Sequence, residues 1–488
     1  MNLKKVAISG IKWTSVGTIG RSLFQLLQIS ILTRFLPKEA FGLVAMALFV
    51  VQFSNIFVDM GLTSAILYRQ NATKNEYSSI YWLNIFISLI LYLILFIGAP
   101  IVAKFYNEPE LRLLVPILGV NLLLMATGRQ HRTIMQKQFQ FKAIAITELG
   151  SFFLGLIAAI LLALNNFGVY SLVYSTLLAS FISNGLFLAQ NLRLNPIRFY
   201  FRLRETKPFL KVGGFSMGSM LLDFFSRETD VLIIGKMLGA ESLGVYSLSK
   251  QIVIKVYAIV NPIIINVLSP ILSSMQKDKA KIKQSFLLVV NLLASINLPV
   301  YLLIVILSKE ILTILYGADY ISGYLVLSFL AIYYGTNSIS NPVGSLQIAT
   351  GRTDIGFKWT ILRVLIAPAV IYFAANFSIN AVAATIAILS IVLMFPLWWM
   401  QLKPMANIKL KEYLQQFSKP YLLLLVIAGV YLLGSHFYEL PFGTIVNAII
   451  KGSVGMVLFF GSLWVVDKKR IMEIYKLILN QINKSIPI

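Results

Sequence analysis

Long apolar runs, separated by short polar breaks, cover almost the whole chain. An α-helix needs roughly 20 predominantly apolar residues to cross the hydrocarbon core of a bilayer, and most of these runs reach that length. The pattern predicts about fourteen membrane-spanning helices, at 10–34, 39–61, 79–103, 111–130, 143–164, 168–190, 211–235, 242–270, 285–308, 322–348, 358–376, 379–401, 419–435 and 443–466. We therefore expect an all-α integral membrane protein.

The first apolar run is expected to be a retained span. A cleaved signal peptide has a short apolar region followed by a cleavage site with small residues. Here the run extends to about Leu36, contains Arg21 and carries no such site.

The basic residues of the polar breaks indicate the orientation, because cytoplasmic loops are enriched in Lys and Arg. If the N-terminus is cytoplasmic, the connections on that side, counted with the adjoining span ends, hold 29 basic residues and the outer connections hold seven, while six lie deeper inside spans. This bias predicts that both termini lie in the cytoplasm. The longest polar stretch, 192–208, is a basic linker that anionic lipid headgroups would hold at the cytoplasmic surface.

An internal repeat divides the chain. Segment 34–47 aligns with 236–249 at an offset of 202. The identical pairs are Leu36/Leu238, Glu39/Glu241 and Gly42/Gly244. A weaker similarity relates 165–179 to 375–389.

Each pair of segments occupies the same place in a set of six spans, so both sets enter the membrane from the same side. Such repeats are related by a pseudo-twofold axis along the membrane normal. The predicted organisation is a six-helix lobe over 1–191, the linker 192–208, a second six-helix lobe over 209–402, and two further helices with a cytoplasmic tail over 403–488.

Composition narrows the class of protein. Of 488 residues, 58% are hydrophobic and 12% charged, with a mean hydropathy of +0.80. Soluble domains have roughly 45–50% apolar and about 25% charged residues. A soluble enzyme, a nucleic-acid-binding module and a disordered scaffold are therefore excluded, and the net charge of +23 belongs to cytoplasmic loops.

Metal and cofactor chemistry is not expected. The chain has no cysteine and two histidines, which excludes disulfides and thiolate metal sites and argues against the usual kinds of zinc site. It also lacks a GxxxxGK[ST] phosphate loop, so we expect no ATP hydrolysis.

Charged residues within the predicted spans are the candidate functional residues. An ionisable group in the hydrocarbon region costs at least about 2.5–3.5 kcal/mol and usually faces a protein interior or a wet cavity. Asp223, Arg227 and Asp230 are spaced four and three apart, which places them on one helix face. A structural ion pair between helices is an equal alternative for the two acids. Arg227 is favoured as a ligand because other cations recur at similar depth: Arg21, Lys250, Lys255 and Arg363.

Five embedded cations among few acids predict a cavity for an anionic substrate. Arginine binds phosphate through a bidentate fork and lysine binds it as a point charge. Arg21 and Arg227 are therefore the expected principal ligands, with snorkelling as the simpler alternative for each lysine. The acids Asp223, Asp230 and Glu148 are candidates for ion coupling.

Two further cations, Arg129 and Arg132, are candidates for attracting a phosphate at the cytoplasmic mouth. The enrichment of cytoplasmic loops in basic residues explains most of their cluster without such a role.

Several stretches carry a resemblance to a known family. They include ISGIKWTS (8–15), FGLVAMAL (41–48), GRQHRTIMQKQFQF (128–141), TDVLIIGKMLGAESLGVYSL (229–248) and NPVGSLQIATGRTDIGFKWT (341–360). The chain resembles the polysaccharide flippases of the multidrug/oligosaccharidyl-lipid/polysaccharide superfamily, especially Wzx-type exporters related to the colanic acid exporter.

The resemblance implies flipping of an undecaprenyl-pyrophosphate-linked oligosaccharide from the inner to the outer leaflet of the bacterial plasma membrane, through alternating access of two lobes. It also implies a role in O-antigen, lipopolysaccharide or exopolysaccharide synthesis, with a polymerase and other assembly proteins as candidate partners. Lys250 and Lys255 lie where the colanic-type pattern is expected to carry uncharged residues, so their assignment rests on charge and depth alone.

Three other classes stay open. A drug or cation-coupled exporter of the same superfamily would share the architecture, but its cavity should be rich in acids. A lipid-linked sugar polymerase or ligase would need a sizeable outer loop, whereas every predicted outer loop is short. A facilitator-type sugar porter would carry a charged Gly/Asp/Arg signature, which segment 61–76 lacks.

Overall fold

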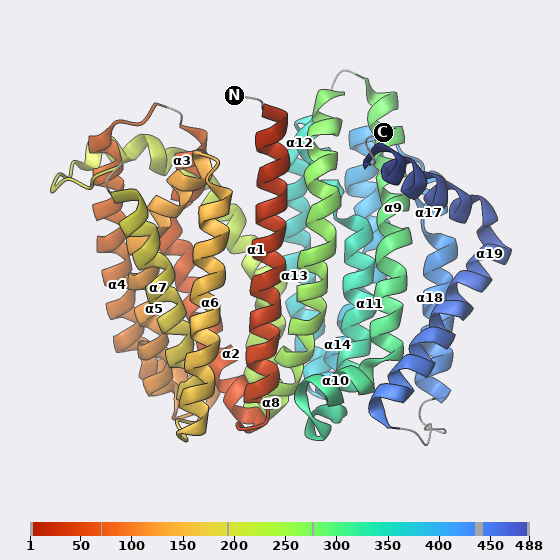
Figure 1. The fold of residues 1–488 in the computed structure, drawn as a ribbon, viewed down its shortest axis with the longest axis horizontal. Coiled ribbons are helices and arrows are strands. Elements are labelled where there is room, and N and C mark those ends of the chain that lie inside the picture. Colours follow the sequence, from red (N-terminus) through yellow and green to blue (C-terminus); the bar gives the residue numbers. More distant parts are fainter. Residues whose placement is uncertain (1–2, 70, 193–194, 276–277, 435–442, 486–488) are drawn as a thin grey trace. The chain divides into compact units, whose positions relative to one another are not determined.

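The computed structural model describes residues 3–69, 71–192, 195–275, 278–434 and 443–485 (Figure 1). Throughout these ranges the regular structure is helical, and no strand occurs in them. The all-α prediction is confirmed. His436 and the end of the predicted tail, 486–488, lie outside the described residues.

The first six predicted spans correspond to six long helices. These are α1 (Leu3–Leu32), α2 (Lys38–Asp59), α4 (Lys74–Tyr106), α5 (Leu111–Lys137), α6 (Phe141–Leu164) and α7 (Tyr170–Leu192), with the short α3 (Leu62–Tyr68) after α2. Local sequence explains several of their ends. Thr73 and Glu76 form a reciprocal capping box at the start of α4, and Asn107 ends it in the left-handed conformation.

The remaining spans are more irregular. They are formed by α8 (Leu203–Ser274), α9 (Lys279–Ile306), α11 (Tyr324–Ser340) with α12 (Val343–Thr350), α13 (Thr353–Ala375), α14 (Ile379–Val392), α18 (Ser418–Gly434) and α19 (Thr444–Ser485). Short helices lie between them: α10 (Ser308–Tyr316), α15 (Met394–Leu397), α16 (Lys403–Ala406) and α17 (Leu410–Gln415). The prediction of two spans within 211–270 matches α8, which is kinked at Gly239 (φ 79°).

Ten helices in the described part of the chain are long and apolar enough to cross a membrane. The second crossing of α8, together with α1, α11–α12 and α18, completes the predicted set of about fourteen. α8 begins at Leu203, so the last residues of the predicted linker are already helical.

The helices group into two compact units. The first comprises 1–248 and 363–379, and the second comprises 249–362 and 380–488. In the first unit α5 packs against α4 and α7, and α6 packs against α7 and α1 (Figure 1). In the second unit α9 packs against α11, α18 and α19. The boundary falls within α8, and the division into two lobes at 192–208 stays a prediction.

Candidate functional site

A close approach of α1 to α6 prepares the first part of the site. A Cβ atom at Gly17 would lie 3.3 Å from the Cβ of Ala145, and one at Gly20 would lie 2.4 Å from Cδ2 of Leu149. The helices are thus in close contact at these two glycines, at the Cβ of Ala145 and at a terminal methyl group of Leu149. The next residue on α1, Arg21, consequently meets Glu148 on α6.

Glu148 lies between two arginines. Its Oε2 atom is 3.6 Å from Nη1 of Arg21. Its Oε1 atom accepts a hydrogen bond of 2.8 Å from Nε of Arg132 on α5 and forms an ion pair of 2.8 Å with Nη2 of the same side chain. We call Arg21, Glu148 and Arg132 the arginine–glutamate triad. The Glu148 side chain is 13% exposed, whereas those of Arg21 and Arg132 are 37% and 40% exposed. The triad therefore carries one net positive charge on accessible guanidinium groups.

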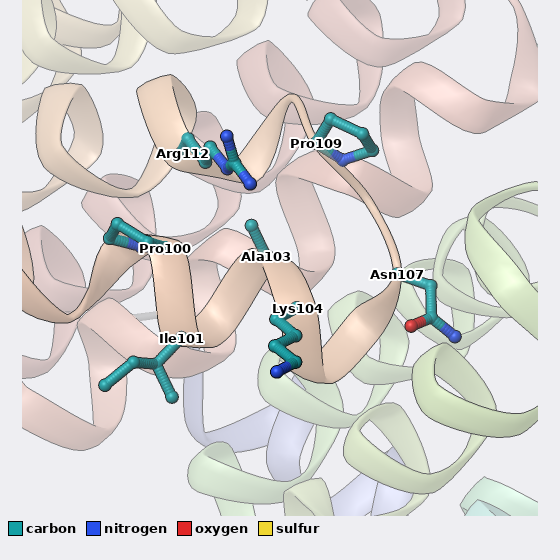
Figure 2. A pocket seen from close by; sticks show the side chains of 7 residues that line it. All are labelled: Pro100, Ile101, Ala103, Lys104, Asn107, Pro109 and Arg112. Carbon is teal, nitrogen blue, oxygen red and sulfur yellow. The ribbon is translucent and has the colours of Figure 1, made fainter.

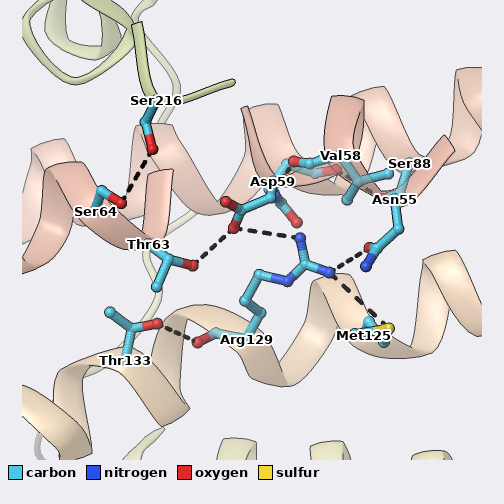
Figure 3. Close-up of polar contacts among 11 residues, drawn as sticks. Asn55, Val58, Asp59, Thr63, Ser64, Ser88, Met125, Arg129, Thr133 and Ser216 are labelled. Carbon is cyan, nitrogen blue, oxygen red and sulfur yellow. Dashed lines mark hydrogen bonds and ion pairs between the residues drawn. The ribbon is translucent and has the colours of Figure 1, made fainter. Parts of the chain in front are cut away.

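Arg129, one turn earlier on α5, has different surroundings (Figure 3). Its Nη1 atom is 3.4 Å from Oδ1 of Asp59, and its Nη2 atom donates to Oδ1 of Asn55. Asp59 also accepts a 2.7 Å hydrogen bond from Thr63. The Arg129 and Asp59 side chains are each 14% exposed. This second group, which we call the Arg129 cluster, joins α5 to the end of α2.

The predicted charged face of α8 is divided between two settings. Arg227 forms an ion pair of 2.9 Å with Asp223 one turn away, and both side chains are more than half exposed. Asp230 is buried and accepts a 2.5 Å hydrogen bond from the Tyr246 hydroxyl. Arg227 thus keeps an accessible guanidinium, while Asp230 is enclosed by protein.

The other predicted cations belong to separate stretches of the chain. Lys250 is buried and Lys255 is half-buried, both on the second half of α8 in the second unit. Arg363 on α13 is half-buried in the first unit. Of the predicted site residues, the structure thus brings Arg21, Arg132 and Glu148 into one group and pairs Asp223 with Arg227.

Sequence reasoning anticipated the pairing of Arg227 with Asp223 but not the partners of Arg21, Arg129 and Arg132. Asn55 carries no charge and gave no signal, although it accepts from Arg129. The arginine–glutamate triad depends on the rotation of three helices about their axes, which a hydropathy pattern does not specify. The spacing of Gly17, Gly20 and Arg21 was the one available sign of a close helix contact.

A shallow hollow lies elsewhere, at the turn between α4 and α5 (Figure 2). Pro100, Ile101, Ala103, Lys104, Asn107, Pro109 and Arg112 line it. None of the predicted site residues is among them.

Comparison with known proteins gives consistent matches over most of the chain. A family described as "Polysaccharide biosynthesis protein" matches residues 31–325. The teichuronic acid biosynthesis protein TuaB of Bacillus subtilis is 31% identical over 444 residues, which cover 89% of this chain and 91% of that protein. The lipopolysaccharide biosynthesis protein WzxC of Escherichia coli is 24% identical over 436 residues, covering 89% of each chain.

Among solved structures, the lipid II flippase MurJ in its inward closed conformation matches with a TM-score of 0.76. The match covers 94% of this chain and 100% of that one at 15% sequence identity. At this identity the likeness concerns the fold.

Proposed function

This chain belongs to the polysaccharide biosynthesis protein family, and on that premise we propose that it moves a lipid-linked oligosaccharide from the inner to the outer leaflet of the membrane. The family agrees with the resemblance noted in the sequence. The proposed role is that of a multi-pass membrane transporter and not of an enzyme, which the many apolar helices and the polysaccharide biosynthesis relatives support. The bacterial plasma membrane is the proposed location.

The proposed substrate carries a pyrophosphate between a polyprenyl chain, of the undecaprenyl type, and its sugars. The relatives' names refer to a teichuronic acid and a lipopolysaccharide, both of which are assembled from sugars. A pyrophosphate cannot cross about 30 Å of hydrocarbon unless other groups replace its hydration. The polyprenyl chain, in contrast, remains in lipid throughout.

The observation that carries the proposal is the arginine–glutamate triad. Guanidinium groups form bidentate, charge-assisted hydrogen bonds with phosphate oxygens. Glu148 holds Arg21 and Arg132 in place as a shared counter-ion. An arriving pyrophosphate competes with this carboxylate, so binding stays moderate and the product can leave. A proton or cation on the displaced Glu148 would couple transport to an ion gradient.

Arg227 is proposed as a second contact for the same headgroup. Its ion pair with Asp223 resembles the triad, because here too an accessible guanidinium is held by a carboxylate that an anion can replace. Lys250, Lys255 and Arg363 are proposed as supporting cations. A polymerase and other assembly proteins are proposed as the partners that use the flipped product.

Complementation tests this function. The gene is expressed in a flippase-deficient strain that makes a matching polysaccharide, and surface polysaccharide is measured along with the amount of protein in the membrane. Arg227→Ala should abolish export. Arg227→Lys should retain part of it, because lysine keeps the positive charge but lacks the bidentate guanidinium. Arg112→Ala, which removes an exposed arginine in the first turn of α5, is the matched control and should export normally. Full export by Arg227→Ala would remove Arg227 from the proposed site.

The orientation is also a proposal. Single cysteines can be introduced cleanly into this cysteine-free chain. A membrane-impermeant thiol reagent applied to intact cells should label exposed positions near 107, 166, 240, 318 and 378 and spare positions near 205 and 280. The opposite pattern would invert the topology.

A further inference from the structure

The second half of α11, near the middle of the predicted span 322–348, presents polar side chains on its accessible face. Tyr333, Tyr334 and Asn337 are half-buried there. Thr336 is buried, and its hydroxyl is hydrogen-bonded at 2.5 Å to that of Tyr421 on α18. α11 therefore has one face packed against protein and one accessible face, and the accessible face is polar.

The accessible face of α4 has the opposite composition. Between 86 and 101 all of its exposed side chains are apolar, as expected of a helix that faces lipid; they include Phe86, Leu93, Ile97 and Ile101. Polar side chains at membrane depth usually face the interior of the helix bundle or a water-filled space. We therefore expect the accessible face of α11 to be in contact with water.

Four tyrosines from three helices of the second unit gather at this face. The ring of Tyr334 contacts those of Tyr333 and of Tyr257 on α8, at centroid distances of 5.1 Å and 5.6 Å. Tyr301 belongs to α9, which packs beside α11 (Figure 1). A Cβ atom at Gly335 would lie 3.5 Å from the Cβ and Cδ2 atoms of Tyr301. We call Tyr257, Tyr301, Tyr333 and Tyr334 the tyrosine site.

Tyr301 brings an unused hydrogen-bonding group to this site. Its side chain is fully buried, and within the described part of the chain its hydroxyl has no hydrogen-bond partner. One turn earlier on α9, the Oδ1 atom of the buried Asn297 likewise has no partner among the described residues. Buried polar groups are normally paired, because leaving one unpaired costs free energy. The hydroxyl groups of a ligand would satisfy both.

We propose that the tyrosine site binds a sugar ring of the lipid-linked substrate. The proposal rests on the transport function above and adds to it a site for the sugars. A sugar ring has faces formed by C–H groups and a rim of hydroxyls. The aromatic rings cover the faces, and the phenol and amide groups bond the rim.

The charge of the site fits the same part of the substrate. The phenol and amide groups are uncharged, so they suit the sugars, whereas the pyrophosphate is assigned to the arginines of the first unit. Lys250 lies seven residues before Tyr257 and therefore shares its side of α8. This proposed supporting cation thus belongs to the same helix face as the tyrosine site.

The first test compares two lipids that differ only in their sugars. Undecaprenyl pyrophosphate and the oligosaccharide-bearing lipid extracted from the complementing strain are each titrated calorimetrically into the purified protein. Tyr301→Phe and Tyr334→Leu should weaken binding of the sugar-bearing lipid several-fold and leave binding of undecaprenyl pyrophosphate unchanged. A cluster that only packs would not respond to Tyr301→Phe, which keeps the ring and removes a hydroxyl that bonds no described group.

Tyr106→Phe is the matched control. Tyr106 is also buried, and its hydroxyl has no partner within the described ranges, but it lies at the end of α4 in the first unit. This variant should bind both lipids like the wild type. Melting temperatures of all the variants confirm that each is folded.

The outcomes separate the tyrosine site from the proposed function. Unchanged binding of the sugar-bearing lipid by Tyr301→Phe and Tyr334→Leu would overturn the site, as would equal affinities of the wild type for the two lipids. Binding of the sugar-bearing lipid without binding of undecaprenyl pyrophosphate would keep the site and contradict the pyrophosphate ligands. Binding of neither lipid would contradict both.

The second test asks whether the site faces water. Asn337→Cys is treated with a membrane-impermeant thiol reagent in intact cells and in inverted membrane vesicles. It should react, because thiol reagents need a thiolate in contact with water, and the sugar-bearing lipid should slow the reaction. Ile97→Cys, at a lipid-facing position whose native side chain is 74% exposed, is the control and should stay unreacted. An Asn337→Cys variant that is unreactive from both sides would overturn the sugar site.

Discussion

Two arginines on α5, Arg129 and Arg132, lie three residues apart and have opposite surroundings. The Arg129 side chain is 14% exposed and bonded to Asp59 and Asn55. The Arg132 side chain is 40% exposed and shares one carboxylate with Arg21. Both were candidates for phosphate binding on charge alone. Their difference separates a cation that holds helices together from one that can receive a ligand.

The physical reason lies in the number of partners for each positive charge. In the Arg129 cluster one carboxylate faces one guanidinium, and Asn55 and Thr63 occupy further hydrogen-bonding positions. In the arginine–glutamate triad one carboxylate faces two guanidinium groups, which leaves donors and net charge for an anion. A buried pair is costly to break by removing one member. An incoming phosphate therefore gains more binding free energy at the partly exposed triad, which has an excess positive charge, than at the Arg129 cluster.

The largest expected effect is the loss of transport when the triad loses its cations. A variant combining Arg21→Ala with Arg132→Ala should reach the membrane and export no polysaccharide, because both guanidinium ligands of the pyrophosphate are missing. Complementation with quantified membrane protein measures this. Normal export by the double variant would show that the substrate takes a different route.

The next largest effect is on folding. Arg129→Ala leaves the Asp59 carboxylate without its guanidinium and should destabilise the protein by about 3 kcal/mol. The melting temperature of the purified protein in detergent reports this. Combining Arg129→Met with Asp59→Asn removes both charges and should restore most of the stability with export intact. If the restored protein fails to export, Arg129 binds the substrate and the distinction between a structural Arg129 and a ligand-binding Arg132 is wrong.

The sequence predicted the spans well because hydropathy is a property of each segment by itself. The repeat around Gly42 and Gly244 was also visible, and the kink at Gly239 falls at the predicted turn between two spans. Helix ends were less accurate. The hydropathy pattern indicated one continuous span over 322–348. In the structure α11 ends just before Asn341–Pro342 and α12 begins just after it.

The site was predictable only as a set of charges. Arg21, Arg132 and Glu148 were all named, but their association depends on how three helices rotate and how closely α1 approaches α6. Small residues such as Gly17 and Gly20 lie at that contact, and their partners are distant in sequence. Depth in the membrane likewise did not distinguish buried Asp230 from exposed Asp223. Asp230 accepts a hydrogen bond from the hydroxyl of Tyr246, which follows the kink in α8, and the hydropathy pattern does not predict that contact.

A smaller effect is expected from Glu148→Gln. Removing the shared carboxylate charge leaves Arg21 and Arg132 without a counter-ion, so inorganic pyrophosphate should bind the purified protein several-fold more tightly. Export should slow because release becomes harder. Calorimetric titration against the wild type measures the affinity. Weaker binding would mean that Glu148 positions the arginines more than it competes with the anion.

The smallest effect is expected at the hollow between α4 and α5. Lys104→Gln and Arg112→Gln remove exposed cations that belong to neither group (Figure 2). Stability should change by less than about 0.5 kcal/mol, as is usual for surface substitutions, and export should be unaffected. A clear loss of export would extend the anion path to this hollow.

Reconstitution tests the central claim most directly. Purified protein is placed in liposomes that contain a polyprenyl-pyrophosphate-linked oligosaccharide, and the appearance of its sugars in the opposite leaflet is followed by their accessibility to an impermeant sugar-modifying enzyme. The wild type and the Arg129→Met/Asp59→Asn variant should both move the substrate, whereas the Arg21→Ala/Arg132→Ala variant should leave it in its original leaflet. Equal rates for the two double variants would contradict the assignment of substrate binding to the arginine–glutamate triad.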